Sequence, residues 1–240
     1  QQHLLPGSLP EVAGFDIAAT SRPSRGVSGD YYDVIAGEGG KAWVALGDVS
    51  GKGVPAALTM ATLRTLFRSE LEHNQPLGEA MRRIGEGLWR CTAPEVFATF
   101  CFGALDPASA TFTYVNAGHP YPVLVRRDGR RIPLASAGMP VGMDPMLTGL
   151  SPYQEQTVTL EPGDVLVLYS DGVTEAGDAD GEMFGEERLW AAVEEQRLGD
   201  ARAVQEEICQ KVSTFLEFQP PGDDLTLVVI KAKPATGGEG

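Results

Sequence analysis

The sequence predicts an α+β fold built from layers of antiparallel β-sheet and helices. Short apolar runs, which predict strands, follow one another at hairpin distance, whereas segments with helical periodicity stand in separate blocks. The runs are continuous rather than alternating, which is typical of strands covered on both faces. A chain of 240 residues that is 42% hydrophobic and 22% charged can bury such a core, in one large domain or two small ones.

Six strands are predicted, and turn residues follow most of them. The apolar runs lie at residues 43–46, 97–105, 111–115, 121–125, 165–169 and 225–230. The turn signals after the first five runs are Gly47-Asp48, Asp106-Pro107, Asn116-Ala117-Gly118, Asp128-Gly129 and Ser170-Asp171-Gly172.

Four helices are predicted from apolar residues that recur at helical spacing. They span residues 55–71, 77–88, 186–195 and 204–216. Pro76 suits the first turn of the second helix, and Asp200 is a candidate N-cap of the last. No repeat or linker divides these elements, so we expect one domain over residues 11–233, preceded at 1–10 by the end of an upstream segment. Residues 234–240 are Gly-rich and predict a disordered tail.

The composition excludes several classes of protein. A formal net charge of -14, from 33 acidic and 19 basic residues, argues against a nucleic-acid partner and suits binding of divalent cations. No apolar stretch approaches the roughly 20 residues of a membrane span, and no signal peptide is visible. The three cysteines are dispersed without a CxxC pair, which predicts reduced thiols in the cytoplasm. The chain starts with Gln rather than Met, so we expect it to belong to a longer protein.

Aspartates stand at the ends of the predicted strands. Asp48 and Asp171 each follow a strand, whereas Asp223 and Asp224 directly precede the last one. If the last strand runs antiparallel to the other two, these carboxylates meet at one end of the sheets. The acidic motif at residues 28–33 lies before the first strand and contributes two more aspartates.

Clustered carboxylates predict a site for hard cations. They repel each other unless they are protonated or neutralised by cations, and oxygen ligands without His or Cys select magnesium, manganese or calcium. Two such ions can share a carboxylate and lower the pKa of a bound water to about 7. The chemistry implied is hydrolysis of a phosphate ester by metal-activated water.

Each of these features also has an ordinary interpretation. A single aspartate in such a place is more often a turn or cap residue, and only the shared placement favours a site. The glycines of residues 47–53 do not form a phosphate loop, because only three residues separate Gly47 from Gly51-Lys52. His119 could act as an acid or base, but a hydrogen-bonded structural role is favoured.

Six motifs in order identify a family resemblance that spans about residues 4–231. Together they resemble the SpoIIE-like, RsbU-like bacterial branch of the metal-dependent type-2C (PPM-type) serine/threonine protein phosphatases. The motifs are Ser28-Gly29-Asp30-Tyr31-Tyr32-Asp33, Gly47-Asp48-Val49-Ser50-Gly51-Lys52-Gly53 with Ala56-Ala57, Asn116-Ala117-Gly118-His119-Pro120, Gly138-Met139-Pro140-Val141-Gly142, Ser170-Asp171-Gly172-Val173-Thr174-Glu175 and Gly222-Asp223-Asp224-Leu225-Thr226-Leu227.

The resemblance implies a fold and a set of metal ligands. The fold would be a sandwich of two antiparallel β-sheets flanked by helices. Asp48 would bridge two Mn²⁺ or Mg²⁺ ions, with the carbonyl of Val49 on the second. Asp171 and Asp223 would complete the first ion, and Asp30 would support the second. Asp48, Asp171 and Asp223 would thus act in catalysis through the metals and a hydroxide that bridges them.

Other positions match the family less well. Asp224 adjoins the matching position, and Asp33 is more typical of a structural residue. Ser50 stands where the eukaryotic branch has a His proposed as the acid for the leaving group, so that acid is not identified. Arg25 lies near the offset of that branch's phosphate-binding Arg, but an exposed loop residue is favoured.

The resemblance also implies partners. The substrate would be phosphoserine or phosphothreonine on a protein, an anti-sigma-factor antagonist of STAS type, in a cytoplasmic signalling pathway. An upstream sensor domain in the same chain would precede the phosphatase, and residues 1–10 would be the end of its linker helix. Neither nucleic acid nor direct membrane contact is expected, and a homodimer is left open.

Two other functions compete with this one. A two-metal nucleotide hydrolase or cyclase would need a base-binding pocket and basic residues for a triphosphate, and the sequence suggests neither. A catalytically inactive PPM-fold sensor or binding module is the main alternative. Loss of Asp48, Asp171 or Asp223 would favour it, and all three are present.

Overall fold

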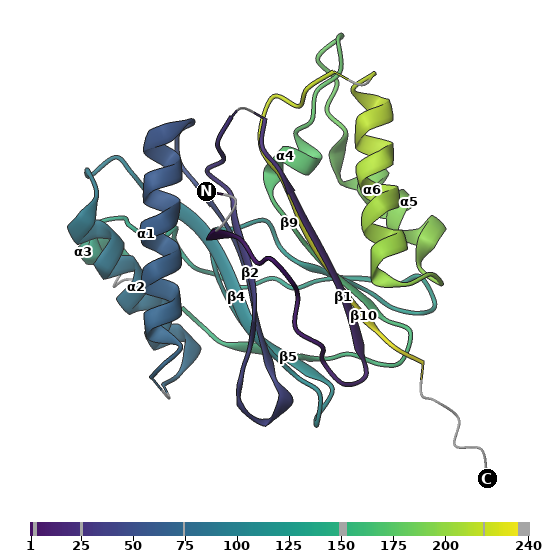
Figure 1. Cartoon of the computed structure of the whole chain (residues 1–240), viewed down its shortest axis with the longest axis horizontal. Coiled ribbons are helices and arrows are strands. Elements are labelled where there is room, and N and C mark those ends of the chain that lie inside the picture. Colours follow the sequence, from purple (N-terminus) through teal and green to yellow (C-terminus); the bar gives the residue numbers. More distant parts are fainter. Residues whose placement is uncertain (2–3, 25, 74, 149–152, 218, 235–240) are drawn as a thin grey trace.

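The computed structural model describes residues 1, 4–24, 26–73, 75–148, 153–217 and 219–234. Two antiparallel sheets face each other, and helices cover their outer faces (Figure 1). The first sheet has the order β1 (Phe15–Arg22), β10 (Leu225–Ala232), β9 (Val165–Tyr169), β6 (Val123–Val125) and β7 (Arg131–Pro133). The second has the order β2 (Tyr31–Ala36), β3 (Ala42–Val49), β4 (Ala98–Asp106), β5 (Thr111–Ala117) and β8 (Gln156–Thr159). The predicted fold class is confirmed.

The helices form two outer layers. On the second sheet lie α1 (Val54–Glu70) and α2 (Leu77–Cys91), and on the first lie α5 (Gly185–Gln196) and α6 (Ala201–Phe215). Two short helices, α3 (Pro145–Thr148) and α4 (Asp171–Thr174), and the 3-10 turn Glu38–Gly40 lie in connections. The side chain of Asp200 accepts a hydrogen bond from the backbone of Ala203, which confirms it as the N-cap of α6.

Three apolar layers result, one between the sheets and one beneath each helix pair. Successive side chains of a strand point to opposite faces, so Tyr31 joins the layer under α1 whereas Tyr32 joins the layer between the sheets. Phe67 of α1 packs its ring 5.4 Å from that of Phe100 and 5.2 Å from that of Phe102, both on β4. Burial on both faces explains the continuous apolar runs.

All six predicted strands and all four predicted helices are present. Sequence patterns do not reveal β1, β2, β7 and β8, which carry polar residues or are very short, and they predict a turn at the start of α4. The free cysteines agree with the predicted thiols, since Cys101 and Cys209 are buried and Cys91 is exposed. None of the helices in the described ranges combines the length and the apolar character that a bilayer crossing requires.

The first residues pack on the domain. Of residues 1–10, where the sequence predicts the end of a linker helix, residues 5–10 form bends and coil. The carbonyl of Leu4 accepts a hydrogen bond of 2.7 Å from Arg64 Nε of α1, and Leu5 packs against the core. Apart from Pro234, the predicted tail lies outside the described residues, as does Arg25.

Candidate metal centre

The ends of β9 and β10 bring three aspartates to one place. The two strands pair antiparallel, with Tyr169 opposite Leu227, so Asp171 after β9 and Asp223 before β10 lie at the same end of the sheet. The antiparallel arrangement on which the sequence prediction depended is therefore confirmed for these two strands. The contact is close, because a methyl group at Gly172 would collide with the carbonyl oxygen of Asp224.

The second sheet brings Asp48 and Asp30 to each other. Asp48 is the second-to-last residue of β3, and Asp30 directly precedes the first residue of β2. A Cβ atom on Gly29 would lie 3.4 Å from Asp48 Oδ1 and 3.0 Å from the carbonyl oxygen of Val49. The connection from β1 to β2 thus lies against the start of the loop at residues 48–53.

A serine joins the two sheets at this point. Ser170 Oγ, at the end of β9, donates a hydrogen bond of 2.8 Å to Asp30 Oδ2 and accepts one of 3.0 Å from the backbone nitrogen of Thr226. Asp30 therefore lies beside the residue that precedes Asp171. The starts of α1 and α4 lie at the same end of the sandwich (Figure 1). We call Asp30, Asp48, Asp171 and Asp223 the carboxylate cluster.

Asp224 has a different role from its neighbour. Its Oδ1 accepts hydrogen bonds from the backbone nitrogen and hydroxyl of Ser24 at 2.7 and 3.0 Å. Its Oδ2 accepts from the Ser28 hydroxyl at 2.7 Å and the Gly29 nitrogen at 2.8 Å. Burial alone would raise the pKa of Asp224, but these hydrogen bonds outweigh it and hold the pKa below its usual value. Asp224 thus fastens the connection between β1 and β2 to β10.

Asp33 faces the helices rather than the cluster. It is fully buried, and its Oδ2 accepts a 2.7 Å hydrogen bond from the Tyr31 hydroxyl and forms a 2.7 Å ion pair with Arg68 Nη2 of α1. The structural reading of Asp33 fits this position.

The carboxylates of the cluster repel one another. Burial and then the charges of Asp171 and Asp223 raise the pKa of Asp48 from 3.8 to about 7. Burial and the charge of Asp48 raise the pKa of Asp30 well above its ordinary value, and burial with Asp223 raises that of Asp171. Carboxylates with such raised pKa values are in an environment that cations would stabilise.

One basic side chain reaches the cluster. Lys52 Nζ lies 2.7 Å from Asp223 Oδ2 and 3.1 Å from the carbonyl oxygen of Gly222. Among the ion pairs of the described residues, this pair alone involves a member of the cluster. Both side chains are about half exposed, so the pair contributes little to stability, and a cation could displace the lysine.

The oxygen atoms of the cluster are suitable ligands for hard cations that keep some of their bound water molecules. Within the described ranges, no three His, Cys, Asp or Glu side chains are already arranged to hold one metal ion. Manganese and magnesium accept carboxylate and carbonyl oxygens, and magnesium usually keeps several waters beside one or two carboxylates. The carboxylates of the cluster and the Val49 carbonyl are therefore oxygen ligands of the kind that these ions accept.

Two other residues from the motifs have structural contacts. His119 is buried, its Nδ1 lies 2.8 Å from Thr99 Oγ1, and its backbone nitrogen donates to Asn116 Oδ1, as the structural interpretation predicts. Burial lowers the pKa of His119 to about 3, which favours the neutral imidazole near pH 7. Ser50 Oγ accepts a 3.0 Å hydrogen bond from the backbone of Phe97. The acid for a leaving group is still not identified.

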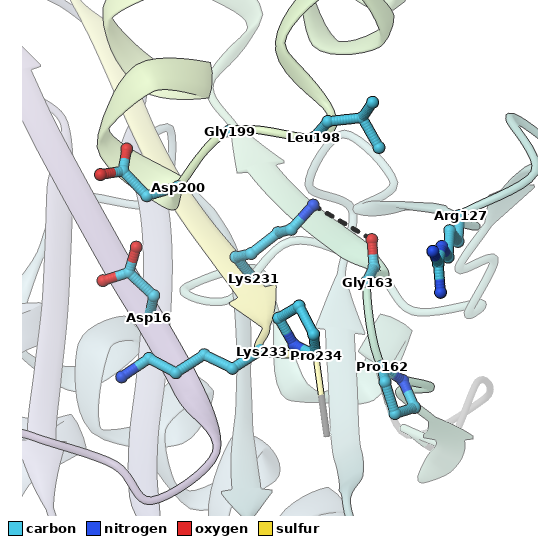
Figure 2. A pocket seen from close by; sticks show the side chains of 10 residues that line it. All are labelled: Asp16, Arg127, Pro162, Gly163, Leu198, Gly199, Asp200, Lys231, Lys233 and Pro234. Atoms are coloured by element: carbon cyan, nitrogen blue, oxygen red, sulfur yellow. Dashed lines mark hydrogen bonds between the residues drawn. The ribbon is translucent and has the colours of Figure 1, made fainter. Parts of the chain in front are cut away.

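A separate hollow of about 300 Å³ lies at the other end of β10 (Figure 2). Its buried Lys231 donates a 3.1 Å hydrogen bond to the carbonyl of Gly163 and another to the carbonyl of Arg197, which ends α5. Because lysine at a helix C-terminus satisfies free carbonyls, this contact explains the buried charge. Six residues of extended strand, about 20 Å, separate Lys231 from the start of β10 beside Asp224. The hollow is not part of the carboxylate cluster.

The raised pKa values predict how stability depends on pH. A folded-state pKa of Asp48 of about 7, above its ordinary 3.8, means that the folded chain binds a proton more tightly than the unfolded chain. Without divalent cations, the free energy of unfolding should therefore fall as pH rises from about 4 to about 7. Asp48→Asn should flatten this slope and stabilise the metal-free protein at pH 8 by on the order of 2 kcal/mol. Urea unfolding in EDTA at several pH values measures both effects, and a variant less stable than wild type at pH 8 would contradict them.

Comparisons of sequence support a relationship over most of the chain. The sequence profile of the stage II sporulation protein E (SpoIIE) family matches residues 38–233. Protein IcfG of Synechocystis sp. is 27% identical over 96% of this chain, which covers 40% of IcfG. The phosphoserine phosphatase RsbU of Bacillus subtilis is 29% identical over 97% of this chain, which covers 68% of RsbU. The chain thus spans less than half of IcfG and about two thirds of RsbU.

Comparisons of structure agree. The RsbU and RsbW domains of Rv1364c from Mycobacterium tuberculosis match with a TM-score of 0.77 and 26% identity, over 95% of this chain and 62% of that one. The catalytic domain of the serine/threonine protein phosphatase PstP, which was solved with two manganese ions, matches with a TM-score of 0.64 over 91% of this chain and 98% of that one. At 16% identity, PstP shows that the fold is shared.

Proposed function

This chain belongs to the SpoIIE family of PPM-type phosphatases, and we propose that it hydrolyses phosphoserine or phosphothreonine on a protein with the help of two Mn²⁺ or Mg²⁺ ions. The observation that carries the proposal is the carboxylate cluster, in which loops from both sheets bring Asp30, Asp48 and Asp171 together and raise their pKa values. Such a cluster is poorly suited to a metal-free protein and well suited to bound cations.

Each residue of the cluster has a place in the proposed site. Asp48 interacts with each of the other three carboxylates and is the ligand that both ions would share, together with the Val49 carbonyl. Asp171 and Asp223 would hold one ion. Asp30, fixed by Ser170, would hold or orient the other. Bound ions of this kind lower the pKa of water to about 7 and polarise a phosphoryl group.

Lys52 is available for a second task in this site. If a cation were bound at Asp223, the ammonium group of Lys52 would lose its carboxylate partner and keep the carbonyl of Gly222, so it would remain beside the cluster. A lysine there can bind a phosphate oxygen as a point charge, which would assist the placement of an anionic substrate.

The substrate we propose is a small phosphorylated regulatory protein, of the STAS type that antagonises an anti-sigma factor. RsbU is a phosphoserine phosphatase, and Rv1364c combines an RsbU domain with an RsbW domain. We also propose an upstream sensor domain in the same chain, because the relatives IcfG and RsbU extend beyond the part that matches this chain. Free cysteines suit the cytoplasm, which we propose as the location.

The test is metal-dependent release of phosphate from a serine-phosphorylated STAS-domain protein, with p-nitrophenyl phosphate as a second substrate. We expect no turnover in EDTA and full turnover once excess Mn²⁺ is added. The restored rate should be the same after each cycle of chelation and metal addition. Turnover that persists after chelation would contradict the metal mechanism. Binding of the phosphoprotein without turnover in any metal would favour an inactive binding module instead.

A further inference from the structure

The hollow at the far end of β10 gathers basic side chains that have no carboxylate partner (Figure 2). Arg127, Lys231 and Lys233 line it, and Arg197 directly precedes Leu198, which lines it too. None of these four basic residues forms an ion pair with a carboxylate of the described residues, although most other basic side chains there do. In a chain with 33 acidic and 19 basic residues, this is a local excess of positive charge.

The ammonium group of Lys231 is buried with its charge uncompensated. The residue is 6% exposed, and Nζ donates to the carbonyls of Gly163 and Arg197. An ammonium group has three donors, so one N–H of Lys231 has no partner in the part of the chain that the structure describes. Burial and the charges of Arg197 and Arg127 lower the pKa of Lys231, and the opposing charge of Asp164 does not outweigh them. A bound anion would therefore stabilise this side chain.

The side chain of Arg127 lies against the residue that holds Lys231. A Cβ atom on Gly163 would lie 3.1 Å from Arg127 Cδ and 3.3 Å from its Cγ. The backbone nitrogen of Arg127 donates a 3.2 Å hydrogen bond to Asp164, whose carboxylate is already paired with Arg126 at 2.6 Å. The guanidinium group of Arg127 is thus attached to an anchored backbone and has no carboxylate of its own.

The two aspartates that line the hollow are engaged elsewhere. Asp16 Oδ2 accepts a 2.8 Å hydrogen bond from the backbone nitrogen of Ala201, and Asp200 Oδ1 accepts one of 2.7 Å from that of Ala203. Both carboxylates therefore serve the first turn of α6. In Figure 2 they lie on one side of Lys231, whereas Arg127 lies on the other.

The remaining walls of the hollow are apolar. Pro162, Leu198 and Pro234 line it, and Leu198 is 77% exposed. The volume of about 300 Å³ is at the lower end of the range of sites that bind small organic molecules. Apolar walls beside a few converging polar groups are typical of such sites.

We propose that this hollow binds a small organic anion, whose phosphate or carboxylate group contacts Lys231 and Arg127 and whose apolar part packs on Leu198 and the two prolines. Lysine and arginine bind such groups through charge-assisted hydrogen bonds. The hollow and the carboxylate cluster lie at opposite ends of β10, so this site is independent of the proposed phosphatase function.

The experiment is an NMR titration of ¹⁵N-labelled, metal-free protein in EDTA with phenylphosphonate. This probe joins an anionic group to an apolar ring and has no ester bond that a phosphatase could hydrolyse. Without metal, the carboxylate cluster repels anions. The amides of Gly163 and Gly199 report on the hollow, and that of Gly172 reports on the cluster. Inorganic phosphate is titrated in parallel to separate a free oxyanion from an organic one.

We expect saturable shifts at Gly163 and Gly199, with a Kd for phenylphosphonate below about 10 mM, and no comparable shift at Gly172. Inorganic phosphate should bind at least about threefold more weakly, because it lacks the apolar ring. Shifts without saturation, or shifts centred on Gly172, would overturn the site. Equal affinity for the two probes would refute the organic part of the proposal.

Two variants of the same hairpin test the role of Arg127. Arg127→Gln should weaken phenylphosphonate binding about tenfold or more, because it removes an exposed charge that no ion pair holds. Arg130→Gln is the matched control, since Arg130 is also exposed but pairs with Asp128 and does not line the hollow. It should bind within about twofold of wild type. Equal binding to wild type and Arg127→Gln would contradict the proposal.

Lys231→Met should abolish binding altogether. This change also removes two hydrogen bonds to carbonyls, so its spectrum must first show the dispersed amide signals of a folded protein. A folded Lys231→Met variant that binds phenylphosphonate as wild type does would overturn the site. If the variant does not fold, the comparison of Arg127→Gln with Arg130→Gln decides.

Discussion

Asp48→Ala is expected to lower the manganese-dependent turnover of p-nitrophenyl phosphate by at least about 1,000-fold, equivalent to roughly 4 kcal/mol of transition-state stabilisation. Asp48 is the carboxylate on which the charges of Asp171 and Asp223 both act, and its removal would deprive both proposed ions of their shared ligand. Asp171→Ala should also cause a large loss, because it removes a proposed ligand of one of the two ions from the cluster.

The control for this prediction is Asp180→Ala, since Asp180 is an exposed aspartate in a turn and lies outside the cluster. It should retain wild-type turnover. More than a tenth of wild-type activity in Asp48→Ala, with folding confirmed by circular dichroism, would show that the cluster does not carry the reaction.

Gly172→Ala is expected to lower the same turnover about 100-fold or more and to cost about 1–3 kcal/mol of stability. Its methyl group would collide with the backbone carbonyl of Asp224, and a backbone atom cannot move aside as the end of a flexible side chain can. The end of β9 would have to separate from the start of β10, which moves Asp171 away from Asp223. Thermal unfolding and steady-state kinetics measure the two effects.

A neighbouring glycine provides the matched comparison. A Cβ atom on Gly222 would meet nothing within 4 Å, although Gly222 directly precedes Asp223. Gly222→Ala should therefore leave turnover within a few-fold of wild type. If Gly172→Ala were equally mild, the close approach of the two strand ends would not be needed for the site.

The sequence was sufficient where local patterns determine structure. Continuous apolar runs located β3, β4, β9 and β10, because these strands are buried on both faces. It was insufficient for β1, where Asp16, Thr20 and Ser21 interrupt the pattern, although this strand pairs with β10 over its full length. That pairing joins residues about 200 positions apart and leaves no local signal.

The same limit applies to the candidate site. Placement at strand ends drew attention to Asp48, Asp171, Asp223 and Asp224, and the family resemblance favoured Asp223 over Asp224. The structure adds a physical reason for that preference, because four hydrogen bonds from Ser24, Ser28 and Gly29 already engage the carboxylate of Asp224. Ser170 and Lys52 were missed as contacts of the cluster, since their partners lie 140 and 171 residues away.

Calorimetric titration of Mn²⁺ into metal-free protein at pH 7.5 tests the central claim most directly, because it needs neither a substrate nor turnover. We predict saturable binding of two ions per chain in wild type, the loss of at least one in Asp171→Asn, and the loss of both in Asp48→Asn. Wild-type protein without saturable binding, or unchanged binding in Asp48→Asn, would contradict the account.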